Sequence, residues 1–186
     1  MLVRPIRPQD SQGLLEGFQR LGPESRYRRF LAPLPKLGRA QLRYLTEVDH
    51  HDHEALLAID PQTRNGLGVA RFVRSREDPS VAEVAVAVAD DWQGRGLGTA
   101  LLQELAGRAR EEGIRRFSAS VLAENSAVIE MVFKLGDAQV TARHDGVVDL
   151  VMDLPRSGLP HSLREALRAA AHGQLRLSRS WFSRSR

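Results

Sequence analysis

The chain contains no cysteine, so its 186 residues offer no disulfide, no thiolate zinc site and no cysteine nucleophile. Long apolar runs are also missing: no stretch approaches the length of a membrane span, and the N-terminal sequence MLVRPIRPQD has no apolar signal region. We therefore expect a cytoplasmic protein with no membrane partner. The hydrophobic content of 42% is enough to bury a core, and the length suits one domain with an appendage.

Charge is distributed unevenly along the chain. Residues 155–186 hold seven arginines against one glutamate, whereas residues 1–154 hold 20 basic and 22 acidic side chains. We expect a slightly acidic domain over 1–154 and a basic C-terminal tail over 155–186, with a short helix near 161–172 followed by a flexible Ser/Arg-rich end. Such a tail suits disorder, docking on the domain, or weak contact with a polyanion.

The stretch from Val84 to Glu112, VAVAVADDWQGRGLGTALLQELAGRAREE, organises the chain. Its β-branched start predicts a strand, QGRGLG predicts a glycine-rich turn, and the remainder predicts a long amphipathic helix. Glycines allow a backbone to approach a ligand closely, and a helix that begins at the same point directs unpaired N–H groups and the positive end of its dipole at that ligand. The arrangement is typical of a pyrophosphate site.

Residues that are missing from the glycine loop disfavour two common classes of phosphate-containing ligand. A Walker loop requires Gly-Lys-Ser/Thr, but the chain has Gly98-Thr99-Ala100, so an ATPase or GTPase is not indicated. A dinucleotide fingerprint requires a third glycine or alanine where Thr99 stands, and a strand-end acid further on. Hydride transfer is therefore also disfavoured.

Alternating apolar residues and turn signals predict the other elements. We expect strands near residues 2–7, 55–60, 67–74, 81–89, 114–122, 138–143 and 147–154. Helices are expected near 10–21, 23–30, 37–48, after the glycine loop, and at 123–134, where Gly136 ends the last of them. Asn65-Gly66 is a strong hairpin signal between two of the strands.

Two polar clusters invite functional hypotheses. The sequence Asp49-His50-His51-Asp52-His53 contains good metal ligands, but adjacent residues rarely point at one ion, so we favour a solvated or acceptor-lining loop and expect no metal site. Three arginines between Ser25 and Arg29 suit either a phosphate or acidic partner or a solvated helix face, and the second is the more common arrangement.

Five segments in this order carry a resemblance to a known family: RPIRP, ESRYRRF, VDHHDHEAL, AEVAVAVADDWQGRGLGTALL and VLAENSAVIEMVFKLGD. Over Leu2 to Leu154 they resemble the acetyltransferase domain of bacterial Pat-type protein lysine acetyltransferases, a group within the GNAT superfamily. The resemblance implies an α/β (α+β) GNAT fold, with a mixed, mostly antiparallel sheet of six to seven strands, splayed at the acetyl-CoA site and flanked by helices. Because it begins at residue 2, we expect no fused cyclic-nucleotide module.

Carried over by position, the resemblance implies acetyl-CoA as co-substrate and no metal. Val86 and Val88 would offer backbone groups to the pantetheine arm, and Asn125 would hydrogen-bond that arm. The pyrophosphate would be wrapped by the loop residues Gln93, Gly94, Arg95, Gly96, Gly98 and Thr99. Each has a purely structural alternative: the valines as core, the glycines as a turn, Asn125 as a helix N-cap.

The reaction also requires a base, because a lysine with a pKa of ~10.4 is neutral only about once in 2,500 molecules at pH 7. Glu83 precedes the valine run, and in the Pat-like pattern a glutamate at this place is the general base. Alternation along the strand leaves both solvent and active site open for its side chain. A backbone N–H near Val86 would stabilise the oxyanion.

One departure from the family pattern concerns the general acid. Many GNAT enzymes place a tyrosine seven residues after the asparagine, to protonate the leaving thiolate, and this chain has Val132 there. A thiol with a pKa near ~8.5 is a tolerable leaving group without help, so activity remains compatible with the sequence.

The combined hypothesis is an acetyl-CoA-dependent N-acetyltransferase that acts by direct attack, with a protein lysine as the favoured acceptor. A small-molecule amine acceptor, a noncatalytic acyl-CoA sensor and nucleic-acid binding through the tail remain as alternatives. The sequence leaves the acceptor and the oligomeric state open.

Overall fold

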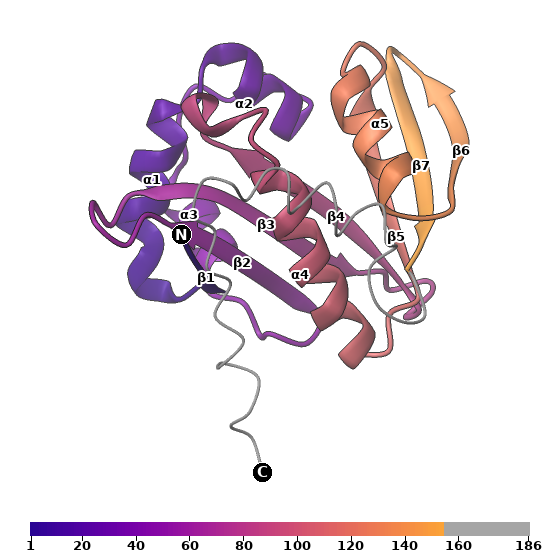
Figure 1. The fold of residues 1–186 in the computed structure, drawn as a ribbon, viewed down its shortest axis with the longest axis horizontal. Helices are drawn as coiled ribbons and strands as arrows, with labels where there is room; N and C mark the ends of the chain where they lie inside the picture. The colour runs from indigo at the N-terminus through magenta and orange to yellow at the C-terminus, as the bar shows by residue number, and fades with distance from the viewer. Residues whose placement is uncertain (155–186) are drawn as a thin grey trace.

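A seven-stranded sheet organises residues 1–154, the part of the chain that the computed structural model describes (Figure 1). Its strands are β1 (Leu2–Pro5), β2 (His53–Ile59), β3 (Gly66–Arg74), β4 (Val81–Val88), β5 (Arg116–Leu122), β6 (Ala138–His144) and β7 (Val147–Asp153). They are ordered β1-β2-β3-β4-β5-β7-β6, and every neighbouring pair is antiparallel except β4 with β5. The mixed, mostly antiparallel sheet expected from the sequence is confirmed. The tail predicted over 155–186 lies outside the described residues.

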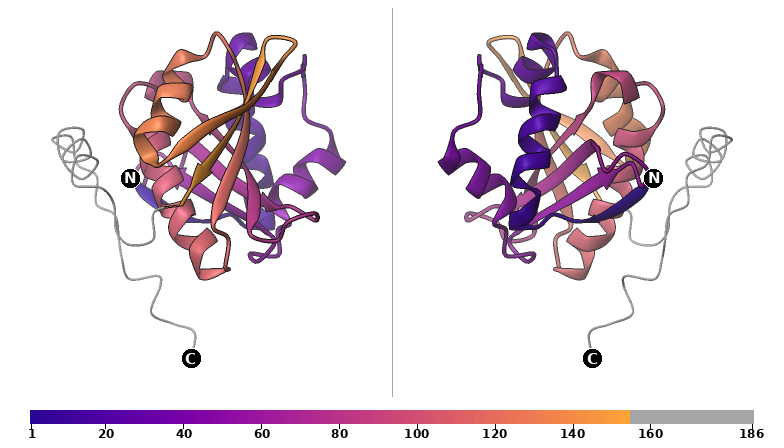
Figure 2. Two further views of the ribbon diagram at one scale, coloured as in Figure 1. Left: turned by 90° about the vertical axis from the view of Figure 1, so that its right-hand side faces the viewer. Right: turned by 90° about the vertical axis from the view of Figure 1, so that its left-hand side faces the viewer.

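Helices cover both faces of the sheet (Figure 2). Strand residues alternate between the faces, so one face receives α4 (Leu97–Glu111) and the other receives α1 (Ser11–Arg20). The remaining helices are α2 (Pro23–Phe30), α3 (Arg39–Thr46) and α5 (Ser126–Leu135). Within residues 1–154 no helix is both long and apolar enough to cross a membrane.

The main core lies between α4 and the sheet. Leu101 and Leu105 of α4 are fully buried against Phe72 of β3 and Phe117 of β5, whose rings are 6.3 Å apart. Smaller cores under α1 and α3 include Ile6, Phe18 and Leu45. Burial on both faces fixes the strand register, because a shift by one residue would expose the buried side chains.

Two turn details differ from the sequence prediction. Between β2 and β3 the left-handed residue is Arg64, with φ of 64°, while Gly66 already belongs to β3. The helix α5 does end at Gly136, but its backbone there is extended rather than left-handed. Glycine is required because a Cβ at this position would lie 2.7 Å from the Asp153 carbonyl oxygen.

The parallel pairing between β4 and β5 is short, and the two strands separate where it ends. Only Val81, Ala82 and Glu83 of β4 are paired with β5, the last with Ser118. Beyond this point β4 stays paired with β3 and β5 stays paired with β7, so the two strands diverge. The separation predicted for the ends of these strands is therefore present, and it begins at Glu83.

Candidate functional site

A cavity of about 580 Å³ occupies the gap between the diverging strands. One wall is Val84 to Val88 of β4, and the opposite wall is formed by Ala119 to Val121 of β5 together with α5. The glycine loop and the start of α4 close one end, and α2 contributes a further side. Of the predicted binding residues, the walls include Val86, Val88, Gln93, Gly94, Gly96, Gly98, Thr99 and Asn125.

The glycine loop has the geometry of an anion cradle. Gly94 and Gly96 have φ of 70° and 78°, values that side-chain-bearing residues seldom adopt. Gly96 is the N-cap of α4 and brings no side chain to cap the first N–H groups of the helix. These donors, at the positive end of a 15-residue helix, adjoin the cavity and suit a diphosphate.

Side chains around the loop hold it in this shape. The Gln93 amide donates to the Val88 carbonyl at 3.1 Å, to Asp90 at 2.9 Å and to the Ser25 hydroxyl at 3.3 Å. Asp90 in turn accepts the Gly22 N–H at 2.8 Å. Since the Gln93 side chain is engaged in this way, its contribution to a ligand would come from the main chain.

Asn125 and Val132 face the cavity from α5. Asn125 is the N-cap residue by position, but its side chain makes no capping hydrogen bond to the first turn of α5. Val132 lies in the wall at the place where many GNAT enzymes carry a tyrosine. The cavity therefore has no phenol at this point.

Glu83 and Arg95 lie outside the cavity wall. Glu83 is exposed at the divergence of β4 and β5, next to the wall residues Val84 and Ala85. Its side chain shares a face with Arg71, since Glu83 and Ala85 pair with Val73 and Arg71. Arg95 is exposed, and its guanidinium lies over the Trp92 ring, 5.1 Å from the centroid.

The sequence prediction missed the contribution of α2. Ser25, Arg28 and Arg29 line the cavity, whereas the sequence alone favours a solvated helix face for this segment. Burial lowers the pKa of Arg29, while the charge of Glu83 opposes the shift. The run of three arginines was the available indication, but only the tertiary contact between Gly22 and Asp90 brings α2 to the loop.

The His/Asp cluster at 49–53 serves the fold, because its side chains point to different partners. His50 contacts the buried Glu54 at 2.7 Å, His51 contacts Glu112, and His53 accepts a hydrogen bond from Arg71 at 3.0 Å. Within residues 1–154 no group of three or more His, Cys, Asp or Glu is arranged to hold a metal ion. The histidines therefore do not converge on one ion.

Comparison with known proteins identifies the family. The profile of the Acetyltransferase (GNAT) family matches residues 23–136, which include the glycine loop, the diverging strands and α5. The chain belongs to the GNAT acetyltransferase family.

Among its relatives, Acetyltransferase Pat of Mycolicibacterium smegmatis is 39% identical over 154 residues, which are 82% of this chain and 45% of the relative. The GNAT domain of S. lividans PAT superimposes with a TM-score of 0.75 at 35% identity, covering 82% of this chain and 89% of that domain. A cAMP-binding acyltransferase from Mycobacterium smegmatis gives 0.58 at 32% identity, covering 91% and 52%. The chain thus spans about half the length of these mycobacterial relatives and nearly all of the S. lividans domain.

The chain is therefore a GNAT-family acetyltransferase, close to the Pat type. The site fits the coenzyme, because the cavity combines an uncapped helix start with unpaired strand backbone and a free Asn125 amide. A Cβ added at Gly98 would contact Val88 and Met131 at 3.6 and 3.8 Å, so a side chain larger than alanine would extend into the cavity that these residues line.

Proposed function

We propose that this N-acetyltransferase transfers the acetyl group to a protein lysine. The observation that carries the proposal is the divergence of β4 from β5 immediately after Glu83, because this exposed carboxylate is next in sequence to the cavity-wall residues Val84 and Ala85. Similarity to the Pat proteins supports lysine as the acceptor. We further propose that residues 1–154 form the enzyme domain and that residues 155–186 form the tail. The cytoplasm is the proposed compartment.

In the proposed site the coenzyme is held by main-chain groups. The N–H groups of the loop from Gln93 to Thr99 bind the diphosphate, and Arg95 contributes its backbone. Val86, Val88 and Asn125 hold the pantetheine arm. Bound acetyl-CoA supplies an activated acetyl group, and a backbone N–H near Val86 stabilises negative charge on its carbonyl oxygen during transfer.

Glu83 prepares the acceptor. It lies on the face of β4 opposite α4, so an amine that approaches from the α1 and α2 side meets its carboxylate before it reaches the cavity. The carboxylate accepts one proton from the ammonium, directly or through water, and the neutral nitrogen then attacks the acetyl carbon. As the new N–C bond forms and the C–S bond breaks, the nitrogen releases its second proton to water, which leaves the neutral amide. The thiolate takes its proton from solvent, because Val132 offers none.

The substitution Glu83→Gln tests this role. Losing the base should lower kcat about a hundred-fold or more, the usual range for general base catalysis, with little change in the Kd of acetyl-CoA measured by calorimetry. Glu77→Gln is the matched control, because Glu77 is an exposed acid in the turn before β4 and does not line this cavity. Equal kcat in the two variants would remove Glu83 from the base role.

Val132 also favours a second candidate, a noncatalytic acyl-CoA sensor, because it leaves the cavity without a general acid at the position of the family tyrosine. Release of free thiol on mixing with acetyl-CoA and a panel of proteins and small amines separates the candidates. Thiol release with proteins alone supports the lysine acceptor, release with small amines alone supports a small-molecule enzyme, and binding without release supports the sensor.

The basic tail adds a separate proposal of weak polyanion contact, based on its seven arginines. DNA binding that weakens with salt, and that is lost on truncation at Pro155, would support it.

A further inference from the structure

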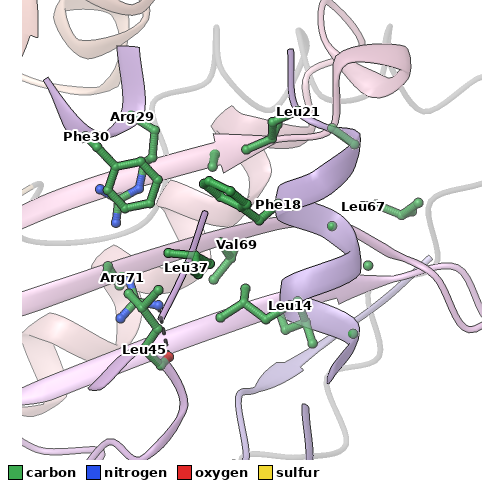
Figure 3. Close-up of a pocket in the computed structure, with 17 residues that line it drawn as sticks. Leu14, Phe18, Leu21, Arg29, Phe30, Leu37, Leu45, Leu67, Val69 and Arg71 are labelled. Carbon is green, nitrogen blue, oxygen red and sulfur yellow. Dashed lines mark hydrogen bonds between the residues drawn. The ribbon is translucent and has the colours of Figure 1, made fainter. Parts of the chain in front are cut away.

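A second pocket, of about 60 Å³, lies on the face of the sheet opposite α4 (Figure 3). Its walls are almost entirely apolar, and Figure 3 shows Leu14 and Phe18 of α1 at one side. Arg29 of α2 and Arg71 of β3 lie at the other side. The volume suits a small group of a few heavy atoms, since one water needs roughly 10–15 Å³ measured in this way.

Arg71 is a buried cation that forms no ion pair with a carboxylate within residues 1–154. The residue is 5% exposed, and its guanidinium donates to the Leu45 carbonyl at 3.0 Å and to the Nε2 atom of His53 at 3.0 Å. Its Nε atom is buried and has no hydrogen-bond partner among the described residues. A buried charge normally has an ionic partner, because removing it from water is costly otherwise.

Arg29 adds a second cation to the same wall. Within residues 1–154 it forms no hydrogen bond or ion pair, and its guanidinium lies over the Phe30 ring, 4.8 Å from the centroid. Burial, together with repulsion from Arg29, lowers the pKa of Arg71 to about 9, so the Arg71 guanidinium remains charged at neutral pH. Two like charges in an apolar pocket are stabilised by an anion placed between them.

The pocket adjoins the coenzyme cavity. Leu21, Arg29 and Ala87 belong to the walls of both. Arg71 and Glu83 are on the same face of adjacent strands, two residues apart in register, because Arg71 pairs with Ala85 and Glu83 with Val73. An acceptor whose amine lies at Glu83, and which carries a negative group a few bonds from that amine, would therefore reach Arg71 with the negative group.

We propose that the pocket is an acceptor subsite that binds a carboxylate between Arg29 and Arg71. Guanidinium groups bind carboxylates through paired, charge-assisted hydrogen bonds, and the apolar walls accommodate the short stem that carries the carboxylate. The assignment rests on the proposed function, since it makes the acceptor a lysine compound with a nearby carboxylate. That carboxylate belongs either to an acidic side chain beside the target lysine of a peptide or to the free carboxyl group of a small amino acid.

Two matched substrate pairs test the assignment with the full-length enzyme. Nα-acetyl-lysine and Nα-acetyl-lysinamide differ only in the carboxylate, and two peptides that place Glu or Gln beside one lysine differ only in the acidic side chain. We expect the carboxylate member of at least one pair to have a KM about ten-fold lower or more, the effect of one good charge-assisted interaction. The pair that responds identifies the source of the carboxylate.

The KM advantage should disappear in Arg29→Gln and Arg71→Gln and persist in Arg43→Gln. Arg43 is an exposed arginine of α3 that lines neither pocket. Its substitution by glutamine therefore removes the same positive charge without changing the walls of the pocket. Equal KM values within both pairs in the wild-type enzyme would overturn the subsite. Absence of turnover with every amine would instead overturn the proposed function, and with it the acceptor role of the pocket.

A binding measurement gives a readout independent of turnover. Sodium butyrate should raise the Tm of the wild-type protein above that in butyramide or in sodium chloride of equal ionic strength, and the rise should vanish in Arg29→Gln. Arg29 is only partly buried, so this variant guards against a failure of Arg71→Gln to fold. An equal Tm in butyrate and butyramide would overturn the carboxylate site.

Discussion

At the scale of single residues, Asn125 has a side chain that caps nothing. It occupies the N-cap position of α5 and lines the coenzyme cavity, yet no hydrogen bond links its amide to the first turn of the helix. A residue that stabilises its own helix normally makes such a bond. The free amide is therefore available to a ligand.

Asn125→Ala should weaken acetyl-CoA binding about three- to ten-fold, the effect of losing one hydrogen bond, and should leave the Tm nearly unchanged. Calorimetric titration and thermal melting measure the two quantities. Glu124→Ala is the control, because Glu124 is an exposed neighbour outside the cavity wall. A lower Tm with unchanged affinity would make Asn125 an ordinary cap.

At the scale of elements, the glycines at the start of α4 leave the backbone of the first helical turn open to the cavity. The helix begins at Leu97 after Gly96, and a Cβ added at Gly98 in its first turn would lie in contact with the side chains of Val86, Val88 and Met131, which line the same cavity. The backbone is therefore exposed to a ligand where a side chain would otherwise stand.

Gly98→Val should raise the Kd of acetyl-CoA at least ten-fold, because the branched side chain would occupy the cradle. The comparison is Gly107→Ala in the middle of the same helix, where an added Cβ would meet only Arg110, at 3.9 Å. That change should stabilise the protein by about 0.5–1 kcal/mol in urea unfolding and leave the Kd unchanged. An unchanged Kd of acetyl-CoA in Gly98→Val would contradict the assignment of the glycine loop as the binding site of the coenzyme.

Much of this arrangement could be predicted from the sequence. The seven strands and the glycine loop with the helix that follows it could be predicted from local patterns of alternation and glycine spacing, which act over a few residues. The helix expected from residue 123 begins at Ser126 instead. The prediction failed where distant segments meet. The Gly22–Asp90 bond brings α2 into the site, and the burial of Arg71 in a strand follows from the helices that cover it. Neither the Gly22–Asp90 hydrogen bond nor the burial of Arg71 can be predicted from the residues next to it in the sequence.

At the scale of the whole molecule, His53 contributes to the dependence of stability on pH. Burial, foremost, and the charge of Arg71 lower the pKa of His53 from 6.5 to about 4. The unfolded chain therefore takes up a proton near pH 6.5, whereas the folded protein does so only near pH 4. The contribution of His53 to stability is complete above pH 6.5 and is lost as the pH falls through this interval.

We expect the free energy of unfolding to depend less on pH between about 6.5 and 4 in His53→Gln than in the wild type, because glutamine does not titrate. Its side-chain carbonyl can still accept a hydrogen bond from Arg71. Urea unfolding at several pH values measures the slopes, with pH 7.5 as the internal reference, where His53 is neutral in both states. Parallel curves for the two proteins would show that His53 does not carry this dependence.

The three residue pairs that join β4 to β5 divide the sheet into a four-stranded and a three-stranded half. Backbone groups of β4 that turn toward the gap beyond Glu83 have no ladder partner, so the coenzyme arm would act as a temporary strand between the halves. A ligand that binds only the folded state stabilises it by about 2.7 kcal/mol at one hundred times its Kd. Saturating acetyl-CoA should consequently slow amide hydrogen exchange along Val84 to Val88 more than along β2, and a uniform slowing would argue against this bridging.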